Sequence, residues 1–418
     1  MHRRREKTRR VNNFALQRFV LHIPRKQTKK RKKMNNFEFM NPTRLVFGKG
    51  QTAKLSELVP KNAKILMTYG GGSIKRNGVY EQVMKALSGY DITEFGAIEA
   101  NPDYDTLMKA VQVCKDKGID FILAVGGGSV IDGTKFIATA AKCDCVDAWT
   151  ILTDKSFKLP KPIDFASVLT LPATASEMNN GAVISRRKTH EKLAFHNPQG
   201  FPQFSILDPD VVLSLPKKQV SNGIVDIFAH TLEQYLTSCL DTRVMDRWAE
   251  ALLLTLIEEA PELMSPEPSY NCRANYMLTA TMGLNGFIAM GVEEDWATHM
   301  IGHELTALCG LDHGETLAIV HPGVMAVMRR EKHGKLLQYA RRVWNITAAD
   351  EEKAIDEAIE KTESFFRSLG KKTRLYEYSI GEDTINTIVE RFRKRGWRVG
   401  ERGIVTPEKV RQILERVK

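Results

Sequence analysis

Five side chains of metal-ligand type fall into two clusters in the C-terminal half of the chain. Asp226 and His230 are four residues apart, His299 and His303 have the same spacing, and His313 follows a short way downstream. Residues four apart leave the same face of a helix, so each pair can point at one place. A carboxylate and several imidazoles in this arrangement can hold a divalent metal beside a reacting oxygen. The five candidates compete for about four tetrahedral positions, or about five to six if the metal is Fe²⁺.

The elements that must position these side chains are two helices and the turn between the second helix and His313. Apolar spacing predicts a helix over residues 221–240, and a break near Gly310 would let His313 return toward the same point. A single Asp-x-x-x-His pair is more often a surface ion pair or a buried histidine with a protein partner, but two such pairs and one further histidine in apolar surroundings favour a metal. Because Glu304 directly follows the second histidine, the metalloprotease motif H-E-x-x-H is absent and metal-dependent hydrolysis is disfavoured.

Two predicted strands, residues 65–69 and 121–125, end in the same kind of glycine turn. The first continues into Gly-Gly-Gly-Ser at 70–73, and the second into Gly-Gly-Gly-Ser at 126–129 before a predicted helix over 130–140. Glycines allow the backbone to approach a phosphate, whose charge the free N–H groups of a helix start can meet. In the second turn Ser129 is expected to cap the helix and Asp132 to lie in its first turn. Neither turn matches G-x-G-x-x-G or the ATP-binding loop motif.

A third polar stretch, residues 170–177, follows another predicted strand. It offers three hydroxyl groups and Glu177 at a helix start. Capping of that helix and contact with a ribose or phosphate are both compatible with these residues.

The order of the predicted elements divides the chain into two structural classes. Short apolar runs alternate with amphipathic stretches from residue 39 to 208, which predicts an α/β domain with a mainly parallel, Rossmann-like sheet over residues 34–210. After Pro216 the pattern is helical, so residues 211–418 are expected to form an all-α metal-binding domain. The helices expected there cover residues 219–237, 249–259, 272–290, 298–309, 354–369 and 384–393.

The charge of the chain is concentrated in its first segment. Residues 1–33 hold 14 Lys and Arg against a single acid, Glu6, so the net charge of +11 becomes −2 over the remaining 385 residues. We expect this segment to be a disordered basic extension, or an upstream extension of a chain that natively begins at Met34. Targeting to an organelle, or contact of its basic run with nucleic acid, are the alternative interpretations.

The remaining composition indicates a cytoplasmic protein without a membrane segment. No uninterrupted run of eighteen apolar residues occurs, and residues 14–23 lack the unbroken core of a secretory signal. The six cysteines are scattered, with Cys143 and Cys145 as the close pair, and are expected to be reduced thiols.

Taken together, the chain from Phe37 onward resembles the iron-containing (group III) alcohol dehydrogenases, in particular the branch of NADP-dependent aldehyde reductases and butanol dehydrogenases. The resemblance is carried by YGGGSIKRNG at 69–78, Asn101-Pro102, AVGGGSVIDGTKFIA at 124–138, LPATASEMN at 171–179, ILDP at 206–209, the Asp226/His230 pair, and DWATHMIGHELTALCGLDHGETLAIV at 295–320. It covers about nine-tenths of the chain, and the combination of motifs is highly specific.

The resemblance assigns roles that spacing leaves open. It implies that Asp226, His230, His299 and His313 hold the metal, Fe²⁺ or Zn²⁺, and that His303 lies near the nicotinamide as the catalytic proton relay. Ala175 departs from the glycine usual in the family, and its methyl group could crowd the turn that holds Thr174 and Ser176. The cofactor contacts that the resemblance implies are Gly71, Gly72, Ser73, Asn101, Gly127, Gly128, Ser129, Asp132, Thr170, Thr174, Ser176 and Lys192.

The resemblance also implies the reaction, which is hydride transfer between NAD(P)H and a small aldehyde or primary alcohol. NAD-selective members carry an acid near the first turn, where Gly71 and Gly72 stand here with Ser73, Lys75 and Arg76 close by, so we expect NADP(H), with NAD(H) as the alternative. The expected assembly is a homodimer, with no nucleic acid and no membrane as partner of the enzyme body. Alternatives are a polyol dehydrogenase or dehydroquinate synthase relative, or a nucleic-acid binder acting through its basic tail.

Overall fold

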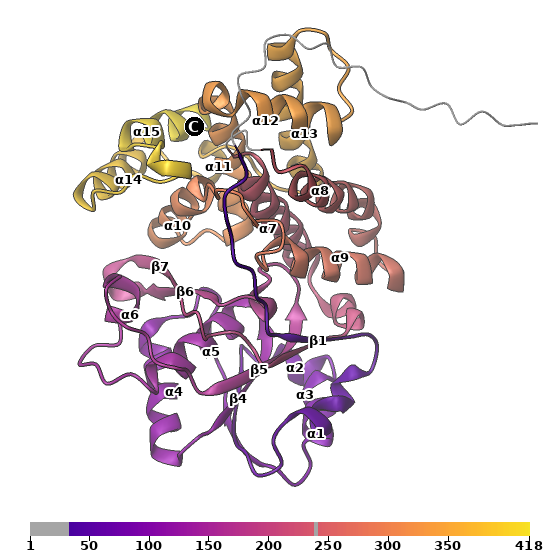
Figure 1. Ribbon diagram of the computed structural model, residues 1–418, viewed down its shortest axis with the longest axis vertical. Coiled ribbons are helices and arrows are strands. Elements are labelled where there is room, and N and C mark those ends of the chain that lie inside the picture. The colour runs from indigo at the N-terminus through magenta and orange to yellow at the C-terminus, as the bar shows by residue number, and fades with distance from the viewer. Residues whose placement is uncertain (1–32, 238–240) are drawn as a thin grey trace, which may run out of the picture.

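A six-stranded parallel sheet organises the N-terminal half of the protein (Figure 1). The computed structural model describes residues 33–237 and 241–418, so the expected extension over 1–33 lies, except for Lys33, outside the described residues. The strand order is β1-β8-β5-β4-β2-β3, and every neighbouring pair is parallel. The strands of this sheet are β1 (Arg44–Phe47), β2 (Lys64–Tyr69), β3 (Asp91–Phe95), β4 (Phe121–Gly127), β5 (Asp164–Leu171) and β8 (Phe204–Leu207).

The central strands are buried on both faces, as a parallel sheet covered by helices requires. In β4 the residues from Phe121 to Gly126 are all buried, which matches their uninterrupted apolar sequence. The helices of this half are α1 (Leu55–Leu58), α2 (Ser73–Arg76), α3 (Val79–Ala86), α4 (Tyr104–Lys117), α5 (Gly128–Ala140) and α6 (Thr150–Thr153). The 3-10 turns of this half are η1 (Gln51–Lys54), η2 (Ser176–Met178), η3 (Arg187–Thr189) and η4 (Pro209–Ser214).

The strand order reverses between β2 and β4. From β2 the chain moves outward to the edge strand β3, and it then returns to form β4 on the opposite side of β2. In open α/β sheets, ligands bind outside the carboxyl ends of the strands at such a reversal. Both glycine turns of the sequence lie there, because one follows β2 and the other joins β4 to α5.

A separate antiparallel hairpin stands beside the sheet and joins the two halves of the molecule. It consists of β6 (Gly181–Arg186) and β7 (Glu191–His196). Its turn and β7 lie against the helical half, where Arg391 donates to the carbonyl of His190 (2.6 Å) and Arg395 pairs with Glu191 (3.7 Å).

The C-terminal half contains helices without a sheet among the described residues, and Figure 1 places it above the sheet. A second hydrophobic core, separate from the main one, joins α10, α11, α14 and α15. The α/β fold followed by an all-helical part is therefore confirmed. The elements are α7 (Lys217–Tyr235), α8 (Arg243–Leu263), α9 (Tyr270–Gly283), α10 (Ala297–Cys309), α11 (His313–Val327), α12 (Arg329–Arg342), α13 (Glu351–Ser368), α14 (Glu382–Lys394) and α15 (Pro407–Arg416), with 3-10 turns η5 (Tyr376–Tyr378) and η6 (Glu401–Gly403).

Three details differ from the sequence expectations. Helix α9 ends at Gly283 and not near residue 290, because the chain turns at Gly286, whose φ is 85°. Helix α5 begins at Gly128 with Gly127 as its N-cap, so Ser129 lies inside the first turn and does not cap it. Of the described residues, none belongs to a helix with the length and apolar character needed to cross a membrane.

The expectation of reduced thiols is wrong for one cysteine pair. Cys143 and Cys145 form a disulfide in the segment after α5, where the two-residue spacing brings their Cα atoms to 5.5 Å. Cys114, Cys272 and Cys309 are free, and Cys239 lies outside the described residues.

Candidate metal centre and cofactor site

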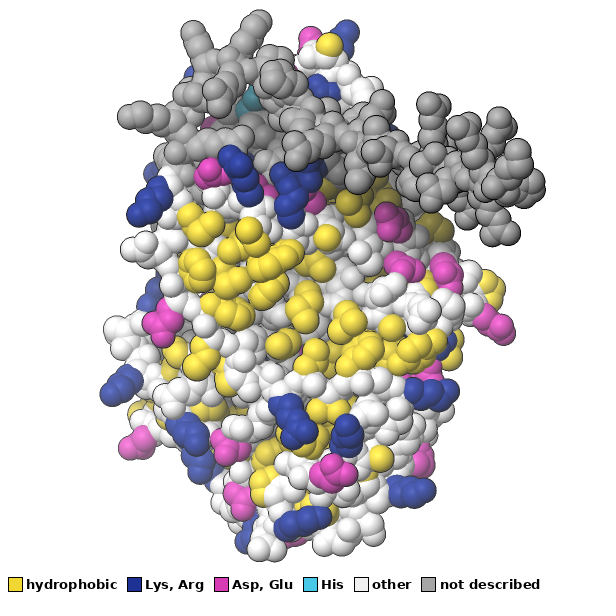
Figure 2. Space-filling view, turned by 45° about the vertical axis from the view of Figure 1, so that its right-hand side comes forward, with side chains coloured by type: hydrophobic (Ala, Val, Ile, Leu, Met, Phe, Trp, Pro, Cys, Tyr) yellow, Lys and Arg dark blue, Asp and Glu magenta, His cyan; other side chains and the backbone are white. Residues whose placement is uncertain are grey.

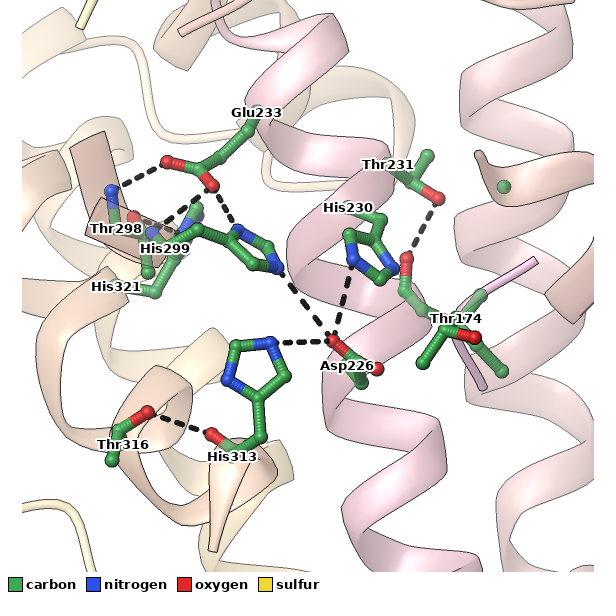
Figure 3. Close-up of polar contacts among 12 residues, drawn as sticks. Thr174, Asp226, His230, Thr231, Glu233, Thr298, His299, His313, Thr316 and His321 are labelled. Carbon is green, nitrogen blue, oxygen red and sulfur yellow. Dashed lines mark hydrogen bonds and ion pairs between the residues drawn. The ribbon is translucent and has the colours of Figure 1, made fainter. Parts of the chain in front are cut away.

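Four of the five metal-ligand candidates converge on one buried point (Figure 3). The Oδ1 atom of Asp226 lies 3.4 Å from His230 Nε2, 3.6 Å from His299 Nε2 and 3.5 Å from His313 Nε2. All four ligand atoms lie within 4.8 Å of one another. Helix α7 supplies Asp226 and His230, α10 supplies His299, and His313 is the first residue of α11.

Local sequence explains how the third element reaches this point. Helix α10 ends at Cys309, and Gly310 follows in the left-handed conformation with φ of 70°. The chain therefore reverses at once, and α11 begins three residues later with His313 facing the other ligands. This is the break that the sequence predicts near Gly310.

The donor set fits a divalent cation because buried polar atoms at its centre have no protein partner. Asp226 Oδ1 and His299 Nε2 are both buried and make no hydrogen bond among the described residues. A buried carboxylate oxygen without a donor is costly unless a cation meets it. Burial lowers the pKa of His230 to about 4 and the pKa of His313 well below its ordinary value, so both imidazoles are neutral, as metal ligands must be.

Glu233 orients one of these ligands and is missed by the sequence analysis. It lies on α7 one turn after His230, is 2% exposed, and accepts hydrogen bonds from Nδ1 of His299 and from the backbone N–H of Thr298 (2.5 Å) and His299 (3.3 Å). A carboxylate at Nδ1 fixes the tautomer and leaves the Nε2 lone pair pointing at the cluster. The spacing D-x-x-x-H-x-x-E along one helix is the sequence signal that could have found it.

Two carboxylates determine the protonation of His299. Burial alone would lower its pKa, but Glu233 and Asp226 outweigh this and raise the pKa to about 9. A metal that binds at Nε2 must therefore displace a proton from this nitrogen, while Glu233 keeps the proton on Nδ1. Its ring stacks on that of His230 with centroids 4.6 Å apart. The imidazole is therefore held in a fixed plane between two acids.

His303 lies next to the four ligands without joining them. Its ring centroid is 6.4 Å from that of His299 and 5.5 Å from that of His313. The side chain is buried, its Nδ1 atom has no hydrogen-bond partner among the described residues, and burial lowers its pKa well below the ordinary value. It is thus a neutral imidazole with a free ring nitrogen beside the centre.

The second glycine turn is shaped by its own neighbours. A Cβ atom on Gly126 would lie 2.5 Å from the side chain of Val130, one on Gly127 would lie 2.8 Å from Leu171 Cβ, and one on Gly128 would lie 2.4 Å from Thr174 Oγ1. These glycines are therefore required for packing of β4 and α5. The result is a helix N-terminus at the strand-order reversal, which is a favourable place for a phosphate.

Three expected cofactor residues from separate segments meet beside this turn. Asn101, whose φ is 54°, donates its backbone N–H to Ser129 Oγ (3.3 Å) and accepts from Lys192 Nζ (2.8 Å) through its side chain. Burial lowers the pKa of Lys192 to about 8, although the carboxylates of Asp226 and Asp132 oppose that shift. Lys192 therefore lies within electrostatic reach of both Asp132 on α5 and the metal-ligand candidate Asp226.

The first glycine turn is open to solvent. Gly71 and Ser73 are exposed, and an added Cβ on Gly71 or Gly72 would meet no atom within 4 Å. Unlike the second turn, this one is not required by packing of its own neighbours.

The remaining expected cofactor residues bond mainly to one another. Ser176 donates to Asp132 (2.5 Å), and its backbone N–H donates to Thr174 Oγ1 (3.2 Å). Thr170 is buried at the end of β5. Ala175 is fully buried with φ of 52°, a conformation that favours glycine, so the departure from glycine strains the backbone, while the crowding by its methyl group stays a prediction. These contacts hold the segment 170–177 against α5.

The chain matches two family models over nearly all of its described length. Residues 42–209 match the model described as iron-containing alcohol dehydrogenase, and residues 220–417 match its C-terminal counterpart. The chain is 50% identical to the NADPH-dependent aldehyde reductase YqhD of Escherichia coli (strain K12) over 91% of this chain and 99% of that protein. It is 43% identical to a probable NADH-dependent butanol dehydrogenase 1 of Bacillus subtilis (strain 168), over 87% and 95%.

Solved structures show the same likeness. The crystal structure of E. coli K-12 YqhD superposes with a TM-score of 0.91 at 48% identity, covering 93% of this chain and all of that chain. The NADH-dependent butanol dehydrogenase A of Thermotoga maritima superposes with a TM-score of 0.87 at 34% identity, covering 92% and 99%.

Proposed function

The chain belongs to the family of iron-containing alcohol dehydrogenases, and from that premise we propose that its NAD(P)-dependent conversion between aldehydes and alcohols takes place at one divalent metal held by Asp226, His230, His299 and His313. The observation that carries the proposal is the buried, unpartnered Asp226 Oδ1 between three imidazole nitrogens. A bound Fe²⁺ or Zn²⁺ would polarise the substrate oxygen while a nicotinamide exchanges hydride with the carbon that bears it.

The protein's own residues then have separate tasks. Glu233 keeps His299 in the tautomer whose Nε2 faces the centre. His303 holds a free ring nitrogen beside the ligands and is our candidate for moving a proton to or from the substrate oxygen. Lys192 and Asn101 position the cofactor where the two halves of the molecule meet.

We propose NADP(H) as the preferred cofactor, with the adenosine end at the first glycine turn and the pyrophosphate at the start of α5. Gly71 and Gly72 leave the first turn without an acid, and Ser73 and Arg76 are exposed there. Hydroxyl and guanidinium groups suit a 2′-phosphate. Relatives described as NADPH-dependent and as NADH-dependent both occur, so the preference is argued from this chain's own residues.

We further propose a homodimer. Figure 2 shows hydrophobic side chains gathered over much of one face. Phe39 and Trp248 are 40% and 36% exposed, and both pack on Phe287, with ring centroids 6.2 and 4.1 Å away. Contiguous apolar patches exposed on a protein surface commonly mark sites of protein–protein interaction. Light scattering of Trp248→Ser against the unmodified protein tests this, because an unchanged mass would contradict a dimer interface at the cluster of Phe39, Trp248 and Phe287.

The function is tested with protein loaded separately with Fe²⁺ and Zn²⁺ and assayed on a panel of small aldehydes with NADPH and NADH. The His299→Ala variant should lose both bound metal and turnover, whereas His333→Ala, which removes a half-buried histidine on α12 that pairs with Glu352, should lose neither. Full activity of His299→Ala without metal would refute the proposed centre.

A further inference from the structure

We propose that Glu94 is a ribose-binding acid that this protein keeps masked, and that the group masking it, Lys75 with Tyr69 and Tyr80, sets the preference for a 2′-phosphorylated dinucleotide. The inference deepens the proposed function and rests on its placement of the adenosine end at the first glycine turn. It concerns which cofactor is accepted, and not the chemistry at the metal.

The position of Glu94 is the first observation. In dinucleotide-binding folds, an acid about 20 residues after the glycine turn, at the end of the next strand, accepts hydrogen bonds from the ribose hydroxyls. Glu94 has this spacing from the turn at 70–73 and is the penultimate residue of β3, which pairs in parallel with β2. The turn at 70–73 is assigned here to the adenosine end and not to the pyrophosphate, so the likeness is one of spacing and strand position. The topology therefore brings a carboxylate beside the turn to which the adenosine end is assigned.

The contacts of the carboxylate are the second observation. Tyr69 OH donates to Glu94 Oε2 (2.9 Å), Lys75 Nζ donates to the same oxygen (3.3 Å), and Tyr80 OH donates to Oε1 (2.7 Å). These donors come from both sides of the glycine turn, since Tyr69 is the last residue of β2 and Lys75 lies on α2. Both oxygens of the acid are thus already engaged.

Electrostatics agree with this geometry. Partial burial works against it, but hydrogen bonds from Tyr80, Tyr69 and Lys75 hold the pKa of Glu94 below its ordinary value, so the acid is charged and needs its cation. The Lys75 ammonium also lies over both rings, 5.0 Å from the centroid of Tyr69 and 4.7 Å from that of Tyr80. Lysine and acid therefore form a neutral pair that two aromatic rings hold in place.

The tyrosine at the centre of this group depends on a glycine. A Cβ atom on Gly96 would lie 2.6 Å from Tyr69 Cε2 and 2.8 Å from its Cζ. Only a residue without a side chain lets the Tyr69 ring lie across the end of β3 and reach Glu94. Gly96 is therefore part of the masking arrangement.

The consequence for a ligand follows from charge and hydrogen bonding. Ribose hydroxyls of NAD(H) need a free acceptor, and Glu94 offers little because three donors occupy it. A 2′-phosphate binds where cations are near and is repelled by a carboxylate whose charge is not neutralised. Lys75 meets both conditions, because it supplies a cation and neutralises Glu94. Removing Lys75 should expose the acid, and removing the acid should free the lysine.

The test uses two nucleotides that differ by one phosphate, adenosine 2′,5′-bisphosphate and 5′-AMP, and measures their binding to the protein by calorimetry. This readout does not depend on turnover or on the metal. The variants are Lys75→Met, Glu94→Gln and the milder Tyr80→Phe, with Lys85→Met, an exposed lysine on α3, as a control for net charge.

Lys75→Met should weaken the bisphosphate about tenfold, the size of one charge-assisted hydrogen bond, and leave 5′-AMP unchanged or tighter. Glu94→Gln should tighten the bisphosphate several-fold, Tyr80→Phe should shift the ratio toward 5′-AMP by less than Lys75→Met does, and Lys85→Met should leave the ratio alone. If both nucleotides bind, but the ratio of their affinities in Lys75→Met and in Glu94→Gln stays within about twofold of the ratio in the unmodified protein, the role of Glu94 and Lys75 is refuted. The proposed cofactor site would stand in that case. Failure of the unmodified protein to bind either nucleotide would overturn the proposed cofactor site as well.

Discussion

Replacement of Glu233 by glutamine is the sharpest test of how the metal centre is held. The carboxylate accepts three hydrogen bonds, from His299 Nδ1, Thr298 N and His299 N. Glutamine has nearly the same shape but only one oxygen, and its amide group must face at least one of these donors. The amide group of glutamine can be accommodated if His299 moves its proton from Nδ1 to Nε2. That tautomer has no lone pair on Nε2, the nitrogen that faces the other ligand candidates.

The expected loss of metal affinity follows from this change of the His299 tautomer. Loss of an outer carboxylate that orients a ligating histidine typically weakens metal binding by about 10- to 100-fold, which is about 1.4 to 2.7 kcal/mol. We expect Glu233→Gln to weaken the metal by this amount and to lower turnover at limiting metal. Excess metal should restore part of the turnover, because Asp226, His230 and His313 are unchanged.

The assay is metal titration of the apoprotein against a competing chelator, with circular dichroism to check the fold. Glu250→Gln is the matched control, since Glu250 is also buried but lies on α8 with Tyr235 and Arg342 as partners. The control should lose stability without losing metal affinity. Equal metal affinity of Glu233→Gln and the unmodified protein would refute the argument that Glu233 sets the tautomer of His299.

Two further predictions concern the fold around the cofactor turns. Gly128→Ala places a methyl group 2.4 Å from Thr174 Oγ1 and should lower the unfolding free energy by about 1 to 3 kcal/mol. Adding Thr174→Ala in the same chain should recover part of that loss. Additive losses of the two substitutions in denaturant titrations would contradict the clash. Burial lowers the pKa of Lys135 to about 8 from its ordinary 10.5, against the carboxylates of Asp132 and Glu177. Between these values the unfolded chain binds more protons, so the contribution of Lys135 to the unfolding free energy rises with pH, and stability curves of Lys135→Met should lack this rise; parallel curves would show that the lysine titrates normally.

Spacing along single helices was enough to place the metal-ligand candidates. Asp226 and His230 are four residues apart and therefore lie on the same face of α7, and Gly310 reverses the chain before His313. Both signals are local in the sequence. Spacing alone left His303 as a fifth candidate; the family resemblance set it apart as the proton relay, and the folded geometry likewise leaves it outside the four atoms around Asp226. That separation depends on how α7, α10 and α11 pack.

Spacing along one helix can single out a residue, but it cannot identify a partner on another element. Glu233 is polar on a helix, which by itself indicates a solvated face, and its partners lie 65 and 66 residues away at the start of α10. The sequence alone presents Lys75 as a free cation for the 2′-phosphate and does not reveal its ion pair with Glu94, because Glu94 belongs to the neighbouring strand β3. The position of the β6–β7 hairpin against the helical half was also not predicted, because its contacts with Arg391 and Arg395 join segments that are distant in the sequence.

The contrast between the two glycine turns has a consequence for how cofactor preference can change in this protein. Side chains at residues 126–128 would collide with Val130, Leu171 and Thr174, so any substitution there requires several others at once. Gly71 has open space and an ordinary φ, so a single substitution such as Gly71→Asp brings in an acid without repacking. With the adenosine end placed at the first turn as proposed, a change between NADP(H) and NAD(H) would require a single substitution there, while the second turn and the fold around the metal-ligand candidates stay unchanged.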